Sequence, residues 1–110
     1  MNPINITFVF GDGTTHDASV TEISTVEELC YNYAWLLVPT STGLNASPTY
    51  SIEVSNTASG PWSAYDPLTQ DADILQPFDD THFAPTYVRI NYNAQTNTAG
   101  TVSFTLTLKK

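Results

Sequence analysis

Four aspartates, Asp71, Asp73, Asp79 and Asp80, crowd one segment of the chain and are the first residues to consider for chemistry. Carboxylate oxygens at that density are ligands that a calcium ion prefers. The spacing nevertheless fits no complete calcium-loop signature, because the central glycine turn and the closing glutamate are both missing. We therefore expect a solvated acidic loop and neither a metal nor a cofactor, and a calcium titration tests the alternative.

Nucleophilic catalysis would have to use His16 or His82, the two histidines, or Cys30, the single cysteine. A nucleophile needs a base within hydrogen-bond reach, and the sequence neither brings Cys30 near His82 nor contains a strained nucleophile turn such as GxSxG. Carboxylate pairs of the glycosidase kind arise by chance in any acidic chain. A lone cysteine forms no intramolecular disulfide, so Cys30 is expected to be an inert buried thiol. The sequence thus predicts no catalytic residue and no enzymatic activity.

The aromatic side chains allow a binding function. Trp35, Trp62 and the six tyrosines could form a platform on which sugar rings stack. Trp35 and Trp62 stand at strand positions, where such rings more often belong to the core. Tyr31 and Tyr87 are better candidates for an outward-facing patch, and an interface between subunits would use such a patch equally well.

These residues are expected to be positioned by the strands of one domain. The 110 residues are the size of a single domain, spanning 1–110, and 41% of them are hydrophobic while only 13% are charged. Threonine, serine and asparagine supply the polar character instead of lysine and glutamate. Because β-branched residues and short polar side chains disfavour helices, this composition predicts an all-β fold.

The net charge of −8 excludes some partners, since eleven carboxylates oppose only three lysines and arginines. A surface of this sign repels phosphate, so we expect no nucleic-acid binding. No apolar run approaches the roughly 18 residues of a membrane span, and the segment MNPINITFVFGDG has no secretory signal pattern. The expected location is therefore the cytoplasm in which the chain is made.

The stretch Thr49–Trp62 shows the strand pattern most clearly. Tyr50, Ile52 and Val54 alternate with polar residues, and the turn after them is expected to return Trp62 towards the same buried face. The same period, or a short apolar run, predicts further strands at Ile4–Phe10, Ala18–Ile23, Tyr31–Val38, Ser63–Asp66, Thr86–Asn93 and Thr101–Leu108. About seven to eight antiparallel strands of this kind predict a two-layer β-sandwich or jelly roll.

The connections between these strands are predicted from their turn residues. Gly11–Thr15 reads as a hairpin turn into Ala18–Ile23, and Asn93–Gly100 reads as a polar hairpin loop. Ser24–Tyr31 carries a capping-box pattern, so we expect there either one short turn of helix, the only one in the fold, or a loop crossing between sheets. Asp66–Pro85 is expected to be one long irregular segment.

Three of these segments together resemble a known family. SIEVSNTASGPW at 51–62, FAPTYVRINY at 83–92 and GTVSFTLTL at 100–108 follow one another as in small β-sandwich virion proteins of tailed bacteriophages. Members of that family typically read VEVSNDG followed by Trp, then YVRV and a final GTL-VTL strand. The resemblance covers roughly residues 31–108, and this chain departs from it by reading NTASG in place of NDG and by its longer acidic loop.

The resemblance implies a non-enzymatic structural protein of a virus particle, most simply a capsid decoration or cement protein, or else a part of the neck or tail. It would be made in the host cytoplasm and reside in the virion. Its partners would be the major capsid protein or other virion proteins, and repeated display favours a homo-oligomer, with a trimer expected. The residues expected at the contact surface are Trp35, Leu36, Val38, Ile74, Leu75, Phe78, Phe83 and Tyr87.

The alternative is a carbohydrate- or surface-binding sandwich module, including an adhesive component of a neck or tail. It predicts a solvent-exposed aromatic strip and sugar binding by a monomer. The virion function predicts an oligomer instead, so the mass of the protein in solution separates the two.

Overall fold

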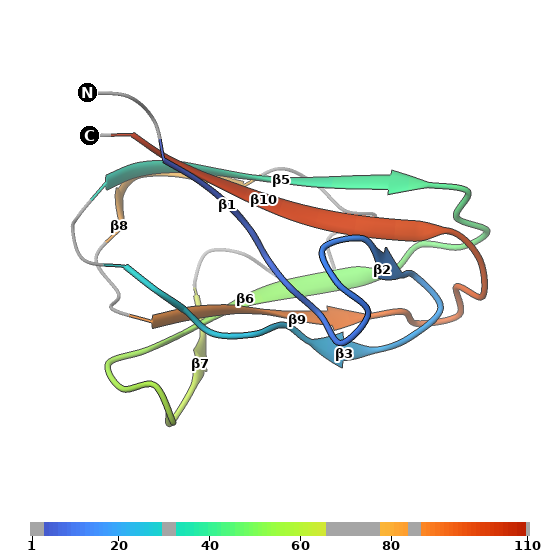
Figure 1. Ribbon diagram of the computed structural model, residues 1–110, viewed down its shortest axis with the longest axis horizontal. Helices are drawn as coiled ribbons and strands as arrows, with labels where there is room; N and C mark the ends of the chain where they lie inside the picture. Colours follow the sequence, from blue (N-terminus) through green and yellow to red (C-terminus); the bar gives the residue numbers. More distant parts are fainter. Residues whose placement is uncertain (1–3, 30–32, 66–77, 84–86, 110) are drawn as a thin grey trace.

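The chain folds into two antiparallel β-sheets that lie face to face (Figure 1). The computed structural model describes residues 4–29, 33–65, 78–83 and 87–109, and within these ranges it describes all side chains except those of 33–35, 78–83 and 109. This part of the chain contains ten strands and no helix, and thus no helix that could cross a membrane. The predicted all-β two-layer sandwich is confirmed.

The first sheet has the order β1-β10-β5-β8, and β2 lies alongside β10 beyond the end of β1. Its strands are β1 (Ile4–Thr7), β2 (His16–Asp17), β5 (Tyr33–Thr42), β8 (Phe78–Phe83) and β10 (Thr101–Lys109). The longest ladder joins β10 to β5, with Leu106 opposite Leu37.

The second sheet has the order β3-β9-β6-β7, and β4 also pairs with β9. Its strands are β3 (Glu22–Ile23), β4 (Glu27–Glu28), β6 (Thr49–Ser55), β7 (Ser63–Ala64) and β9 (Tyr87–Asn93). The β6–β9 ladder runs from Thr49 opposite Asn93 to Ser55 opposite Tyr87. The short β3, β4 and β7 occupy the two margins of this sheet.

The core lies between the sheets and follows from the alternation in the long strands. Every second residue of β10 and of β9 is buried, so that each strand gives one apolar face to the core. The Phe104 ring is fully buried and its centroid lies 5.0 Å from that of Tyr50 and 6.0 Å from those of Phe10 and Tyr92. The buried apolar residues form one cluster of Phe8, Phe10, Ala18, Leu29, Leu37, Tyr50, Ile52, Val88, Ile90, Tyr92, Ala94, Val102, Phe104, Leu106 and Leu108.

The segment Asn93–Gly100 is not a hairpin loop, because β9 and β10 belong to different sheets. The chain crosses between the layers there, and Asn97, only 2% exposed, holds the crossing. Its Nδ2 donates to Ala18 O at 2.9 Å and to Ala99 O at 2.8 Å. Its Oδ1 accepts from the backbone of Asn45 and Ala46, at 2.9 and 3.2 Å. The buried amide thus satisfies backbone groups that would otherwise have been paired in the ladder of a hairpin.

The hairpin predicted around Gly11–Thr15 is also wrong, although the tight turn is present. Phe10 and Gly13 exchange backbone hydrogen bonds of 2.9 and 3.0 Å. The first strand, however, ends at Thr7, and Val9 O accepts from Thr25 N, a residue between β3 and β4. After the turn the chain therefore pairs with β10 as β2 and not with the strand that precedes the turn.

Ser24 does not cap a helix. Its N–H donates to Ile90 O and its Oγ accepts from Ile90 N, both at 2.8 Å, so the chain is held along the edge of β9. Glu27 and Glu28, the candidate capping-box partners, form the short strand β4. Pairing with β9 has overridden the local capping signal, and the described part of this segment is extended.

The segment predicted to be irregular between Asp66 and Pro85 contains a strand. Phe78–Phe83 forms β8 at the margin of the first sheet, with Asp79 opposite Leu36 and Asp80 opposite Trp35. Aspartate disfavours strands, so the sequence FDDTHF gives no strand signal, and backbone pairing with β5 decides the structure instead. Asp71 and Asp73 lie outside the described residues.

Candidate functional site

The residues predicted at a contact surface fall on both sheets. Leu36 is exposed and Val38 is half-buried on β5, and Trp35 belongs to the same strand. Phe78 and Phe83 are the ends of the neighbouring strand β8. The structure thus brings these five onto adjacent strands.

The remaining three predicted contact residues do not join that group. Tyr87 is half-buried at the start of β9, in the other sheet, so it belongs to a separate surface. Ile74 and Leu75 lie outside the described residues.

The outer face of the first sheet carries no charged residue among the described side chains of β1, β10 and β5. Outward-facing residues are paired across the three strands, with Thr105 between Thr7 and Val38. The full set, here called the threonine face, is Asn5, Thr7, Leu36, Val38, Thr40, Thr42, Thr101, Ser103, Thr105 and Thr107. Thr107 Oγ1 donates to Asn5 Oδ1 at 2.8 Å, so neighbouring strands are joined on this face by side chains as well as backbone.

The described carboxylates lie at the margins of this face or away from it. Asp17 on β2 is opposite Thr101, at one end of the threonine face, and Asp79 of β8 is opposite Leu36 at its margin. The other described carboxylates are Asp12 in the first turn, Glu22, Glu27 and Glu28 on β3 and β4, and Glu53 on β6. In a chain of net charge −8, only the part of the face formed by β1, β10 and β5 is without a described charged side chain. Depletion of charge is the property that distinguishes the centre of a protein interface from other surface.

Trp62 does not return to the core as predicted. Arg89 alternates with the buried Val88 and Ile90, so it points outward, and its guanidinium carbon lies 4.2 Å from the centre of the Trp62 ring. Trp62 is therefore half-buried against the outer face of the second sheet. Arg89 Nε also donates to Glu53 Oε1 at 2.7 Å.

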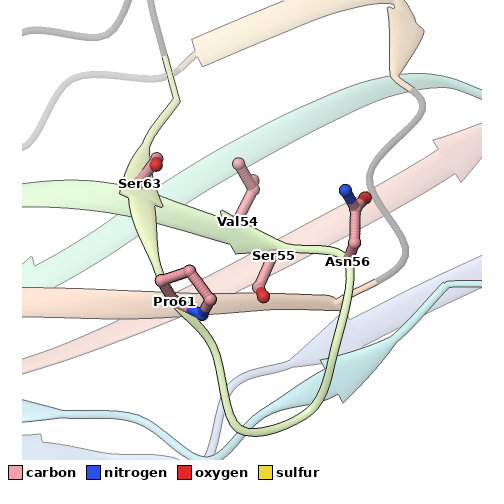
Figure 2. A pocket seen from close by; sticks show the side chains of 5 residues that line it. All are labelled: Val54, Ser55, Asn56, Pro61 and Ser63. Carbon is pink, nitrogen blue, oxygen red and sulfur yellow. The ribbon is translucent and has the colours of Figure 1, made fainter.

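This arrangement bears on carbohydrate binding. One face of the Trp62 ring already stacks on the Arg89 guanidinium, which leaves less of the ring for a sugar. Beside it, the turn between β6 and β7 encloses a small open hollow of about 310 Å³ (Figure 2). The lining residues are Val54, Ser55, Asn56, Pro61 and Ser63, which include neither an aromatic nor a charged side chain.

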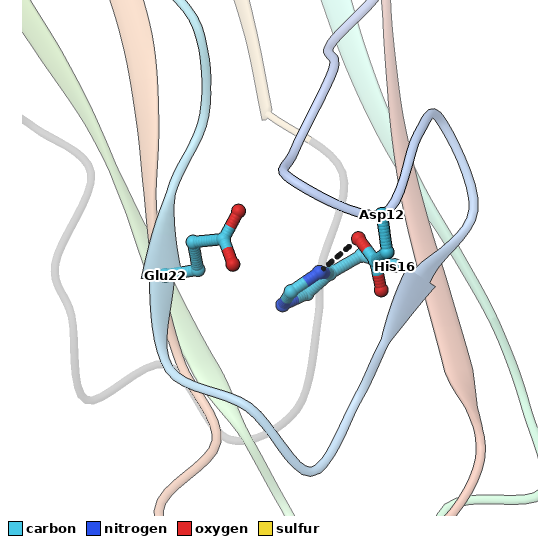
Figure 3. Close-up of side chains that lie close together, drawn as sticks. All are labelled: Asp12, His16 and Glu22. Atoms are coloured by element: carbon cyan, nitrogen blue, oxygen red, sulfur yellow. Dashed lines mark hydrogen bonds and ion pairs between the residues drawn. The ribbon is translucent and has the colours of Figure 1, made fainter.

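A third group of side chains was missed by the sequence analysis. Asp12 from the first turn, His16 from β2 and Glu22 from β3 come together, with one polar atom of each within 4.8 Å of the others (Figure 3). The His16 ring is 1% exposed and stacks on Phe10 at a centroid distance of 4.4 Å, with the Tyr92 ring edge-on at 5.5 Å. The four-residue spacing of Asp12 and His16 was visible in the sequence, but Glu22 joins them only through the fold.

Both nitrogens of the His16 ring face hydrogen-bond acceptors. Nδ1 lies 2.7 Å from Asp12 Oδ1, and Nε2 lies 2.7 Å from Val20 O. The backbone N–H of Asp17 donates to Asp12 Oδ2, and this bond, together with the contact to His16, lowers the pKa of the Asp12 carboxyl from its ordinary value. Asp12 is thereby held as a carboxylate.

Comparison with known proteins adds no relative: the chain matches no protein-family model, no curated protein and no solved structure.

Proposed function

We propose that this chain is a non-enzymatic structural protein of a bacteriophage particle, most simply a capsid decoration protein that docks on neighbouring virion proteins through the threonine face. The observation that carries the docking proposal is that none of the described side chains of β1, β10 and β5 on that face is charged, in a chain of net charge −8. A partner surface that covers this part of the face, short of Asp17 at its end, removes no described charged side chain from water, so little desolvation opposes the contact.

The virion assignment rests on the family resemblance. The three resembling segments contribute β6 with its following turn, β8's last residue with β9, and β10. β10 lies inside the first sheet, and β6 and β9 lie inside the second, so most of the shared pattern lies in the scaffold and not in a peripheral loop.

The assignment is tested on particles. Antibody raised against the purified protein should label tailed particles released from cells that carry the gene, and peptides of the chain should be found when those particles are analysed by mass spectrometry. A protein that is abundant in the cells but absent from the particles would rule out the virion role.

The docking face is tested separately with a matched pair of variants. Thr105→Glu places a carboxylate in the middle of the threonine face, whereas Thr96→Glu places the same charge on an exposed position of the crossing between β9 and β10. We expect Thr105→Glu to abolish binding to heads that lack the protein, and Thr96→Glu to bind as the unmodified protein does. Equal binding by both variants would exclude this face.

The alternative function, binding of glycans by a monomer, is tested with the same protein. It predicts sugar binding that is lost in Trp62→Ala together with a monomeric mass in solution. The stacking of Arg89 on Trp62 argues against it, because the ring is already engaged.

A further inference from the structure

We propose that Asp12, His16 and Glu22 form a binding site for one divalent transition-metal ion of the zinc class. One imidazole nitrogen and two carboxylate oxygens lie within 4.8 Å of one another. A metal bound at about 2.0 to 2.2 Å from each would need only a small inward movement of these side chains. This proposal is independent of the virion function.

Each of the three side chains is anchored to the backbone through one of its polar atoms. Asp12 Oδ2 accepts from Asp17 N at 2.6 Å, Glu22 Oε2 accepts from Gly11 N, and His16 Nε2 lies 2.7 Å from Val20 O. The other polar atoms, Asp12 Oδ1, Glu22 Oε1 and His16 Nδ1, are the candidate ligands, and the Oδ1 and Nδ1 atoms contact each other at 2.7 Å. Hydrogen bonds to the backbone orient metal ligands and fix the histidine tautomer in known sites.

Two of the three side chains already face each other through the atoms that would bind the metal. His16 Nδ1 and Asp12 Oδ1 lie 2.7 Å apart. A metal bound at about 2.0 to 2.2 Å from both atoms would replace this direct contact, and the two atoms would move slightly apart to admit it.

Burial and exposure are distributed as a metal site needs. The His16 side chain is 1% exposed, so its ring is held in place by the surrounding core, and a metal bound to it would have two carboxylates as partners of opposite charge. The Asp12 side chain is 41% exposed, which leaves an access route and room for water as a further ligand.

The donor set selects among metals. Imidazole nitrogen suits zinc and its transition-metal neighbours, whereas calcium and magnesium prefer oxygen-only sites of six or more ligands. We therefore expect magnesium and calcium not to compete.

The experiment is a calorimetric zinc titration of the full chain after removal of metal with chelator, paired with thermal melting. We expect one zinc per chain and a rise in melting temperature. Glu22→Gln keeps an oxygen that accepts from Gly11 N but loses the carboxylate, and should weaken zinc binding by at least about tenfold. Glu28→Gln, an exposed position on β4, makes the same charge change outside the cluster and should bind normally.

Two further variants test whether zinc binds to a histidine or cysteine outside the proposed site. His82→Gln and Cys30→Ser should both retain zinc binding, because neither residue belongs to the proposed site. If Glu22→Gln fails to fold by circular dichroism, Asp12→Asn takes its place, since its amide oxygen still accepts from Asp17 N.

The results of these titrations either support the proposed site or overturn it. Stoichiometric zinc that is weakened by Glu22→Gln or Asp12→Asn, but not by Glu28→Gln, supports the site. Absence of zinc binding by the unmodified chain would overturn the proposal. Zinc bound equally by Glu22→Gln, or lost in His82→Gln or Cys30→Ser, would overturn it as well.

Discussion

The Arg89 guanidinium stacks on the Trp62 ring, with its central carbon 4.2 Å from the ring centre. This contact joins the turn after β6 to β9, two segments that are far apart in the sequence. Gly60 makes it possible, because a Cβ at this position would lie 2.7 Å from Trp62 Cδ1. The same guanidinium pairs with Glu53 on β6, so Arg89 holds three segments of the second sheet together.

Removing this contact should lower stability without changing the fold. We expect Arg89→Ala to reduce the free energy of unfolding by about 1 to 2 kcal/mol, since it loses both the stacking and a half-buried ion pair. Arg89→Lys keeps the charge but not the planar group, and should recover only part of the loss. Urea unfolding followed by circular dichroism measures both, and an Arg89→Ala protein as stable as the parent would contradict the role given to the stacking.

Phe104 is expected to be the most sensitive core position on β10. The ring is fully buried among Phe10, Tyr50 and Tyr92, and Phe104→Ala should cost about 3 to 5 kcal/mol through lost burial and the cavity left behind. Because small domains are stable by only about 5 to 15 kcal/mol, this variant should be close to unfolding. Thr105→Ala, on the adjacent outward position, should change the unfolding midpoint little.

The Asn97 amide should be irreplaceable at the crossing between the sheets. Asn97→Ala removes the hydrogen bonds of the amide to two carbonyls and two backbone N–H groups, of which Ala18 O keeps the Tyr92 hydroxyl as a donor, and we expect a loss of about 2 to 4 kcal/mol in urea unfolding. Asn97→Asp restores the acceptor but turns a charged oxygen towards Ala18 O and Ala99 O. It should therefore be no more stable than Asn97→Ala at neutral pH, and a fully stable Asn97→Asp protein would argue against the assigned amide orientation.

Alkaline unfolding should report the burial of Tyr50. Burial raises the pKa of this phenol from 10.0 to about 12, because the phenolate is disfavoured away from water. A raised pKa contributes stability that is complete below pH 10 and is lost as the pH rises towards 12. The free energy of unfolding should fall over this window, and less steeply in Tyr50→Phe. Phenolate absorbance gives a second measure, and a Tyr50 that ionises at the ordinary phenol pKa of 10.0 would contradict the burial.

The strands that were predicted correctly are those with an unbroken period of two. The alternation in β6, β9 and β10 depends only on which side chains face the core, and this information is local to each strand. β8 was missed for the same reason, since FDDTHF has no alternation and its pairing with β5 is decided by residues far away in the sequence.

The connections were predicted less well because a turn signal does not say which sheet the next strand joins. Gly11–Thr15 and Asn93–Gly100 both contain good turn residues, yet the first is followed by β2, which pairs with β10, and the second lies where the chain changes layers. The capping box at Ser24 failed similarly, since the Oγ that could have capped a helix accepts from Ile90 N instead. These outcomes were set by long-range backbone pairing, to which local propensity yields.

The candidate sites also differ in whether local sequence or long-range pairing determines them. Leu36 and Val38 could be placed at a surface from the strand period alone, because β5 is apolar on both faces. The Asp12, His16 and Glu22 cluster could not, because it needs β2 in one sheet and β3 in the other to be brought together.

The pairing of β1 with β10 has a mechanical consequence. The strands run antiparallel with Ile4 opposite Leu108, so the beginning of one lies beside the end of the other. Tension applied between these two residues would open the hydrogen-bonded pairs one after another, as a zipper opens, and would not shear all of them at once. The domain should therefore yield to a weak pull along this line. An assembly that puts the domain under load would therefore have to contact it through a sheet face and not through Ile4 and Leu108.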